Sequence, residues 1–100
     1  MEIVVKRTGG YAGLSQQIAA FNTTRLDATM AHQVEQLVQN IRFFDLPAVV
    51  SGGTIGADLF QYEITITDGE RQRTVVFVDD ESQQTAPLRS LVEAFSRVGR

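Results

Sequence analysis

Hydrophobic and polar residues alternate in some stretches of the chain and recur at helical spacing in others. The N-terminal residues alternate until the glycine cluster Gly9–Gly13, and residues 14–22 form a second apolar stretch. Alternation with a period of two is typical of strands with one buried face, whereas a spacing of three to four residues is typical of amphipathic helices. The pattern predicts the order strand, strand, helix, strand, strand, helix.

The first helix is expected to begin after Asp27, because aspartate accepts hydrogen bonds from free N–H groups at helix starts. We expect it to end near residues 40–42, before Pro47, which resists further helix. Its apolar stripe is predicted to contain Met30, Val34, Leu37, Val38 and Ile41. Behind it, an apolar segment is expected to pack in the core through Phe43, Phe44 and Leu46.

The pair Asp68-Gly69 lies between two strand patterns, and Asp-Gly is a strong signal for a two-residue hairpin turn. We therefore pair residues 58–67 with residues 70–79. Counting outward from the turn places Ile66 opposite Arg71, Ile64 opposite Arg73, Tyr62 opposite Val75 and Phe60 opposite Phe77. A last short helix is predicted with Leu88, Leu91, Val92 and Phe95 on its buried side.

This order of elements indicates the α+β class, with an antiparallel four-stranded sheet and two helices against one of its faces. The 100 residues suffice for one domain with its own core. Neither a linker nor a low-complexity tract interrupts the pattern, so we expect residues 1–100 to form a single domain.

Composition excludes several classes of function. Twelve acidic and nine basic residues give a net charge of -3, without the clustered positive charge that nucleic-acid binding usually requires. The absence of cysteine excludes disulfides and thiolate chemistry, and it is compatible with a reducing cytoplasm. Crossing a bilayer takes about 20 apolar residues, and no run of that length occurs. We expect neither membrane contact nor a signal peptide.

Catalytic and metal-binding groups are sparse. His32, the only histidine, is predicted to lie off the apolar stripe and in solvent. The acidic cluster at residues 79–81 lacks the spacing of a calcium loop, and serine hydroxyls have no recognisable partner base. We therefore expect a binding module with no metal, no cofactor and no enzymatic activity.

Two glycine-rich segments connect the predicted elements. The cluster around Tyr11 lies between two strands and does not open a helix, so it does not fit a dinucleotide-binding fingerprint. It is either a wide hairpin turn without further function or a loop that presents Tyr11. Residues 51–57 form a second connector, for which a flexible loop is the favoured interpretation.

The order of several short motifs resembles the emfourin family of small bacterial proteins, which inhibit thermolysin-like zinc metalloproteases such as protealysin. The resemblance covers nearly the whole chain. It rests on Arg7-Thr8-Gly9-Gly10-Tyr11-Ala12-Gly13, on Asp27, on Phe43-Phe44-Asp45-Leu46-Pro47, and on Asp58-Leu59-Phe60-Gln61-Tyr62 leading to Asp68-Gly69.

The resemblance implies a cytoplasmic partner protease and an inhibitor that needs no cofactor, and we expect the free protein to be a monomer. The protease-binding residues are then expected to be Arg7, Thr8, Gly9, Gly10, Tyr11, Ala12, Gly13 and Leu14. Steric occlusion is favoured over zinc coordination, because this loop carries no acid, cysteine or histidine. Residues 51–57 are a possible second contact if they lie at the same end of the sheet. The alternative function is a cytoplasmic interaction module that inhibits no protease.

Overall fold

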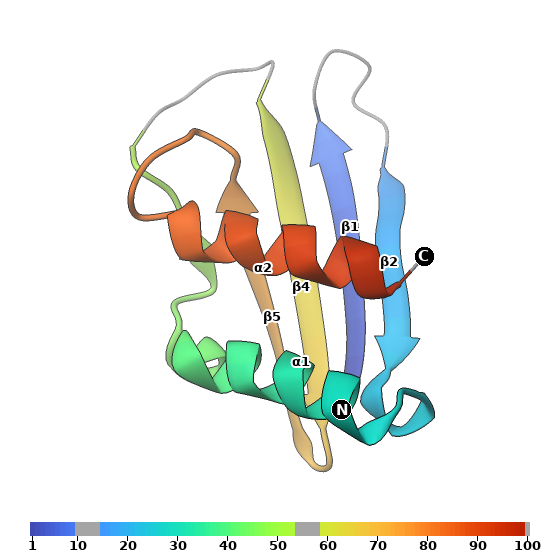
Figure 1. Ribbon diagram of the computed structural model, residues 1–100. Helices are drawn as coiled ribbons and strands as arrows, with labels where there is room; N and C mark the ends of the chain where they lie inside the picture. Colours follow the sequence, from blue (N-terminus) through green and yellow to red (C-terminus); the bar gives the residue numbers. More distant parts are fainter. Residues whose placement is uncertain (10–14, 54–58, 100) are drawn as a thin grey trace.

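A computed structural model describes residues 1–9, 15–53 and 59–99 of the chain. Strands and helices follow one another in the order β1, β2, α1, β3, β4, β5 and α2 (Figure 1). Short 3₁₀ helices lie before and after α1, at Thr23–Arg25 and Phe43–Asp45. The bounds are β1 Glu2–Gly9, β2 Gln16–Asn22, α1 Ala28–Asn40, β3 Val49–Val50, β4 Phe60–Asp68, β5 Arg71–Val78 and α2 Ala86–Val98.

The strands form one five-stranded sheet in the order β2-β1-β4-β5-β3. All neighbouring pairs are antiparallel except β3 and β5, which run parallel, so the sheet is mixed. The α+β class with two helices was predicted, but the four-stranded, purely antiparallel sheet was wrong. The missing strand, β3, has only two residues, which is too short to produce an alternating pattern.

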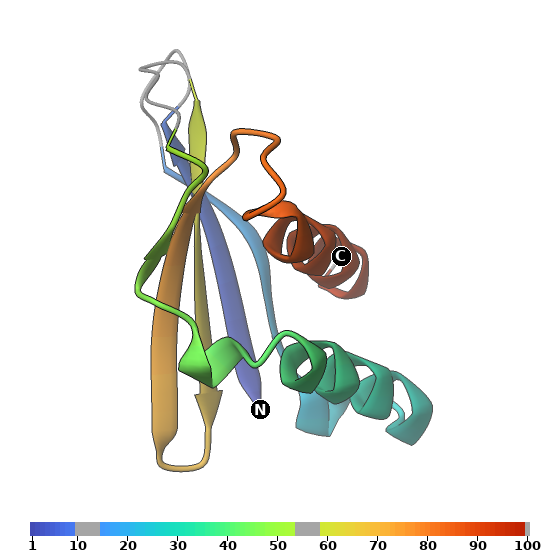
Figure 2. The same ribbon diagram turned by 90° about the vertical axis from the view of Figure 1, so that its left-hand side faces the viewer.

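Both helices lie on the same face of the sheet, and the opposite face is not covered by either of them (Figures 1 and 2). Between helices and sheet lies the hydrophobic core, in which Phe43, Phe77 and Phe95 are the largest fully buried side chains. The other core residues are Ile3, Val5, Ala19, Val34, Val38, Ile64, Ile66, Val75, Leu88, Leu91 and Val92.

Helix α1 begins as predicted, because Asp27 Oδ1 accepts a hydrogen bond from the backbone N–H of Met30 at 2.8 Å. Its apolar stripe is only partly buried, however. Val34 and Val38 are buried, whereas Met30 is 39% exposed and Leu37 is 37% exposed. Both of these side chains line a hollow between α1 and α2, so the sequence stripe is wider than the contact that the helix makes with the core.

The hairpin between β4 and β5 has a register that differs by two residues from the prediction. Asp68 pairs with Arg71, so the turn consists of Gly69 and Glu70 and not of Asp68 and Gly69. Gly69 has a φ of +63°. A glycine with positive φ at the first turn position is typical of type II′ turns, which explains the shift.

The corrected register keeps every side chain on its predicted face but changes its partners. Ile66 lies opposite Arg73, Ile64 opposite Val75, and Tyr62 opposite Phe77, on which its ring stacks with centroids 5.2 Å apart. Phe60 consequently lies beyond the last paired residue of β5, outside the buried part of the hairpin.

Helix α2 buries the four predicted side chains, Leu88, Leu91, Val92 and Phe95. It crosses the sheet from β5 over β4 and β1 to β2 (Figure 1). Neither helix of the described residues is long and apolar enough to span a membrane.

Candidate functional site

The predicted protease-binding residues begin at the end of β1, where the described part of the chain contains three of them. Arg7, Thr8 and Gly9 are the last residues of this strand. Gly10, Tyr11, Ala12, Gly13 and Leu14 lie outside the described residues. The structure therefore describes the base of the predicted loop: the end of β1 and, from Ser15, the start of β2.

Gly9 has a backbone conformation that favours glycine. Its φ is +97°, and it pairs with Phe60 on β4. A Cβ atom at this position would lie 3.0 Å from the carbonyl oxygen of Leu59. Both the left-handed φ and the close carbonyl of Leu59, which precedes β4, therefore disfavour larger residues at the point where the chain leaves the sheet.

Side chains connect β1 to β2 across this base. Arg7 Nη2 donates a hydrogen bond to Oε1 of Gln16 at 2.7 Å. One step further out, Thr8 Oγ1 lies 3.5 Å from Oγ of Ser15, at the limit of a hydrogen bond. These contacts link the residues that precede and follow the predicted loop.

The same arginine also contacts β4. The guanidinium carbon of Arg7 lies 4.4 Å from the centroid of the Phe60 ring, which is the geometry of a cation–π interaction. Phe60 is 38% exposed. It was not predicted as a surface group, because the predicted register placed it opposite Phe77. The turn conformation at Gly69 decides the register, and the Asp-Gly motif alone does not.

The second connector begins near the same end of the sheet. Its described residues, Ser51 to Gly53, are held by the carboxylate of Asp80, which accepts a hydrogen bond from the backbone N–H of Gly52 at 2.7 Å. The backbone N–H of Ser82 and the hydroxyl of Thr85 also donate to Asp80, at 3.0 and 3.1 Å. Residues 54–57 of the connector lie outside the described residues.

The hydrogen bonds to Asp80 favour its charged form. The Ser82 side chain and the Gly52 backbone N–H lower the pKa of Asp80 far below its ordinary value of 3.8, although partial burial opposes this. Gly52 is closely packed as well, since a Cβ atom there would lie 2.4 Å from Cβ of Ser82. Asp80 therefore fixes the start of the second connector against the segment that precedes α2.

We call the end of the sheet that contains Gly9, Gln16, Phe60 and Val78 the loop end. The opposite end, which contains Asn22, Asp68 and Arg71, is the hairpin end. Gly9 pairs with Phe60, and Val78 pairs with Gln61, so both glycine-rich segments depart from or return to the loop end. Ser51–Gly53 meets the sheet there through Asp80, which follows β5 by two residues.

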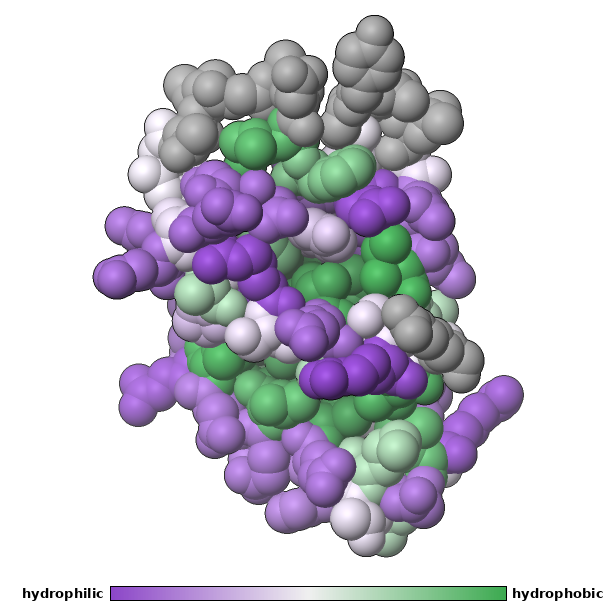
Figure 3. Space-filling view, turned by 45° about the horizontal axis from the view of Figure 1, so that its top comes forward, coloured by the Kyte–Doolittle hydropathy of each residue, from purple (hydrophilic) through white to green (hydrophobic). Residues whose placement is uncertain are grey.

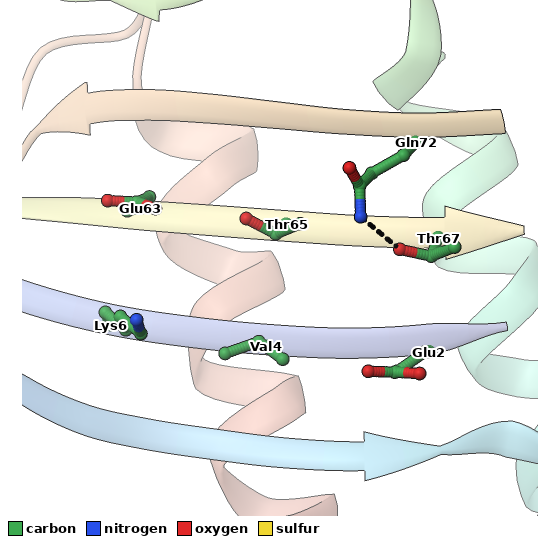
Figure 4. A pocket seen from close by; sticks show the side chains of 7 residues that line it. All are labelled: Glu2, Val4, Lys6, Glu63, Thr65, Thr67 and Gln72. Atoms are coloured by element: carbon green, nitrogen blue, oxygen red, sulfur yellow. Dashed lines mark hydrogen bonds between the residues drawn. The ribbon is translucent and has the colours of Figure 1, made fainter.

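The uncovered face of the sheet has a different character. Figure 4 shows a shallow hollow lined by Glu2, Val4, Lys6, Glu63, Thr65, Thr67 and Gln72. Hydrogen bonds join neighbouring strands here, from Gln72 Nε2 to Thr67 Oγ1 at 3.0 Å and between the hydroxyls of Thr65 and Thr74 at 2.8 Å. The arrangement brings no nucleophile close to a base and is typical of a solvated sheet surface.

Groups for catalysis or metal binding do not converge in the part of the chain that the structure describes. Within residues 1–9, 15–53 and 59–99, no three His, Cys, Asp or Glu side chains could hold a metal ion together. His32 is exposed, as predicted, and lies at the hollow between α1 and α2. Figure 3 shows apolar side chains exposed between the two helices, next to polar ones.

The structure is that of a small α+β protein in which Arg7 and Gln16 link the two strands that flank the glycine-rich segment. The emfourin family model matches residues 5–96, so the chain belongs to the emfourin family. This membership suggests a metalloprotease inhibitor whose partner is a protease. None of the curated proteins and none of the solved structures compared with the chain matches it.

Proposed function

We propose that this protein inhibits a thermolysin-like zinc metalloprotease of the protealysin type by placing residues 7–14 in its active-site cleft. Membership of the emfourin family supports the class of partner. The observation that carries the choice of site is the base of the segment, where Arg7 contacts both Gln16 on β2 and Phe60 on β4.

Fixing the base favours tight binding. A loop whose ends are held loses less conformational freedom on binding, so more of the interaction free energy appears as affinity. The three strands under residues 7–14 belong to one sheet, which sets the direction in which the chain leaves it. Tyr11 or Leu14 is the side chain proposed to enter an apolar specificity pocket of the protease.

Steric occlusion is the proposed mechanism. Zinc in proteins is bound by sulfur of cysteine, nitrogen of histidine or oxygen of carboxylates. The segment Arg7-Thr8-Gly9-Gly10-Tyr11-Ala12-Gly13-Leu14 contains none of these side chains. It is therefore proposed to exclude substrate and water from the cleft without supplying a side-chain ligand to the metal.

The remaining parts of the proposal concern where and in what form the protein acts. We place it in the cytoplasm, as a monomer when free, with a thermolysin-like metalloprotease as its partner. It acts by binding alone, without cofactor or catalysis. Nucleic acids and membranes are not partners in this proposal.

The test is a progress-curve titration against a purified protealysin-type protease from the same organism, with the intact mass of the inhibitor measured at the end. We expect stoichiometric loss of protease activity while the chain stays uncut. Full protease activity at micromolar excess of the protein would overturn the proposal. It would leave the alternative, an interaction module whose partner is then sought by pull-down.

A paired set of variants tests the site. Gly10→Glu combined with Tyr11→Asp is expected to weaken inhibition at least about 100-fold, because bulk and charge are placed where close approach is needed. Arg71→Gln at the hairpin end is the control, since this side chain is exposed and the position is remote from residues 7–14. Equal inhibition by both variants, with equal melting temperatures, would show that residues 7–14 are not the binding site.

A further inference from the structure

Two arginine–phenylalanine pairs occupy opposite ends of the sheet. At the loop end, the guanidinium carbon of Arg7 lies 4.4 Å from the centroid of Phe60. At the hairpin end, that of Arg71 lies 4.2 Å from the centroid of Phe44. The pairs have the same chemistry and nearly the same geometry, so their surroundings can be compared directly.

Their surroundings differ in charge. Arg71 forms an ion pair with Asp68 at 2.9 Å, so its positive charge is balanced within the hairpin. Arg7 is half-buried and donates to the neutral amide of Gln16. Among residues 1–9, 15–53 and 59–99, no carboxylate lies within 4.0 Å of Arg7. Arg7 lines a surface hollow together with Asp79 and Glu93, whose carboxylates lie further than 4.0 Å from it.

Phe60 places an exposed apolar surface beside the guanidinium of Arg7. It is one of four large hydrophobic residues exposed in the described part of the chain, and the only aromatic one. It pairs directly with Gly9, so its ring lies beside the point where the predicted protease-binding loop leaves the sheet. Arginine and aromatic side chains that lose solvent on binding commonly contribute most of the affinity of protein interfaces.

We propose that Phe60 extends the inhibitory surface from residues 7–14 onto β4, and that Arg7, which lies against its ring, receives a carboxylate from the rim of the protease cleft. This inference rests on the proposed function. Among the described residues, the ring of Phe60 and the amide of Gln16 contact the guanidinium of Arg7, and the fork geometry of a guanidinium matches a carboxylate at two points.

The experiment measures association and dissociation rate constants of the protein with the protease at several salt concentrations. Arg7→Gln is expected to lower affinity about ten-fold and to flatten the salt dependence of association, because a charge pair steers encounter. Arg7→Lys keeps the salt dependence but recovers only part of the affinity, since a lysine makes a single-point contact. Phe60→Leu is expected to speed dissociation about ten-fold through lost contact with the protease.

The second arginine–phenylalanine pair supplies matched controls. Arg71→Gln and Phe44→Leu remove the same groups at the hairpin end and are expected to change the inhibition constant less than about two-fold. Circular dichroism and thermal melting of every variant check that the fold is retained. Phe60→Tyr serves as the second aromatic variant and should retain most of the affinity.

The outcomes separate the two proposals. If the wild-type protein does not inhibit the protease, the proposed function fails and this inference fails with it. If the wild type inhibits but Arg7→Gln and Phe60→Leu match it, the inference is overturned and the proposed function stands. If Arg7→Gln loses affinity with an unchanged salt dependence, Arg7 only positions the loop and the carboxylate partner is refuted.

Discussion

The two ends of the sheet illustrate two ways to connect strands. At the hairpin end, β4 and β5 are joined by Gly69 and Glu70 alone, and the Arg71–Asp68 ion pair closes the turn. At the loop end, the connections between strands are longer and contain glycines. The amide of Gln16 and the ring of Phe60 contact Arg7, where the first connection begins. Asp80 accepts a hydrogen bond from Gly52, where the second begins. At the hairpin end Asp68 balances the charge of Arg71, whereas at the loop end no carboxylate of the described residues lies within 4.0 Å of Arg7, and the ring of Phe60 is exposed.

The difference supports the loop end as the proposed binding surface. A short turn has few residues to order, so little conformational entropy is lost when it folds. Its charged groups are paired with each other, so few of them are available to bind another molecule. Long connections cost more to order, and loops held by a rigid scaffold are common sites of binding. Substitutions at matched positions of the two ends should therefore separate effects on stability from effects on inhibition.

The largest effect is expected at Gly9. Gly9→Val places a β-branched residue at a φ of +97° and its Cβ 3.0 Å from the oxygen of Leu59. We expect a loss of about 2–3 kcal/mol in the free energy of unfolding, measured in urea, because strain and overlap add. Inhibition should weaken about 100-fold even under conditions where the variant stays folded.

Gly69→Ala is its counterpart at the hairpin end. The position has a φ of +63°, but apart from its chain neighbours no heavy atom of the described residues would lie within 4 Å of an added Cβ, so backbone strain acts alone. The expected loss is about 1 kcal/mol, with inhibition unchanged. If Gly9→Val lowers the free energy of unfolding no more than Gly69→Ala does, the close contact expected between a side chain at position 9 and the carbonyl oxygen of Leu59 is refuted.

Gly52→Val should have an intermediate effect on stability. Its Cβ would lie 2.4 Å from Cβ of Ser82, so the segment that carries Asp80 must move. Overpacking of this kind costs about 1–3 kcal/mol, which chemical denaturation would detect. If residues 51–57 also contact the protease, inhibition falls as well. Unchanged inhibition by a folded Gly52→Val would exclude that second contact.

Asp80→Asn is expected to act in a pH-dependent way. The pKa of Asp80 is lowered in the folded protein, so its carboxylate stabilises the fold at pH values above its ordinary value of 3.8. This stabilisation decreases as the pH falls below 3.8 toward the lowered pKa, because the unfolded chain takes up the proton first. Melting temperatures of wild type and Asp80→Asn should therefore differ at neutral pH and converge in acid. If the two melting temperatures differ by the same amount at neutral pH and in acid, the charge of Asp80 does not stabilise the fold.

The smallest effect is expected for Arg71→Gln. The ion pair with Asp68 joins side chains that are 64% and 40% exposed. Such pairs contribute about 0–1 kcal/mol, so the melting temperature should move little. A large loss of inhibition by Arg71→Gln would mean that the hairpin end, and not the loop end, meets the protease.

Much of the fold could be predicted because it depends on local patterns. Asp27 marks the start of α1, and the spacing of Leu88, Leu91, Val92 and Phe95 defines the buried side of α2. Strand β3 was missed because two residues carry no periodicity. The hairpin register was wrong because Asp68-Gly69 suits a turn in either of two positions, and the conformation of Gly69 selects one of them.

The site was less predictable because its groups come from different strands. The structure describes where Arg7, Thr8 and Gly9 lie, but protease binding by any of residues 7–14 stays a prediction. Phe60 is distant from Arg7 in the sequence, and only the pairing of β1 with β4 brings them together. No local pattern reports that pairing. Asp80 was considered only as part of the acidic cluster at residues 79–81, and its hydrogen bond to Gly52 likewise depends on tertiary structure.

The position of β1 also affects what proteolysis can do. This strand lies between β2 and β4 and pairs with both, from Glu2 to Arg7 and from Glu2 to Gly9. A cut between Gly9 and Ser15 would separate β1 covalently, yet its backbone pairing and the burial of Ile3 and Val5 would still hold it in the sheet. The nicked protein is therefore expected to stay associated, so that cleavage by the target protease need not release it.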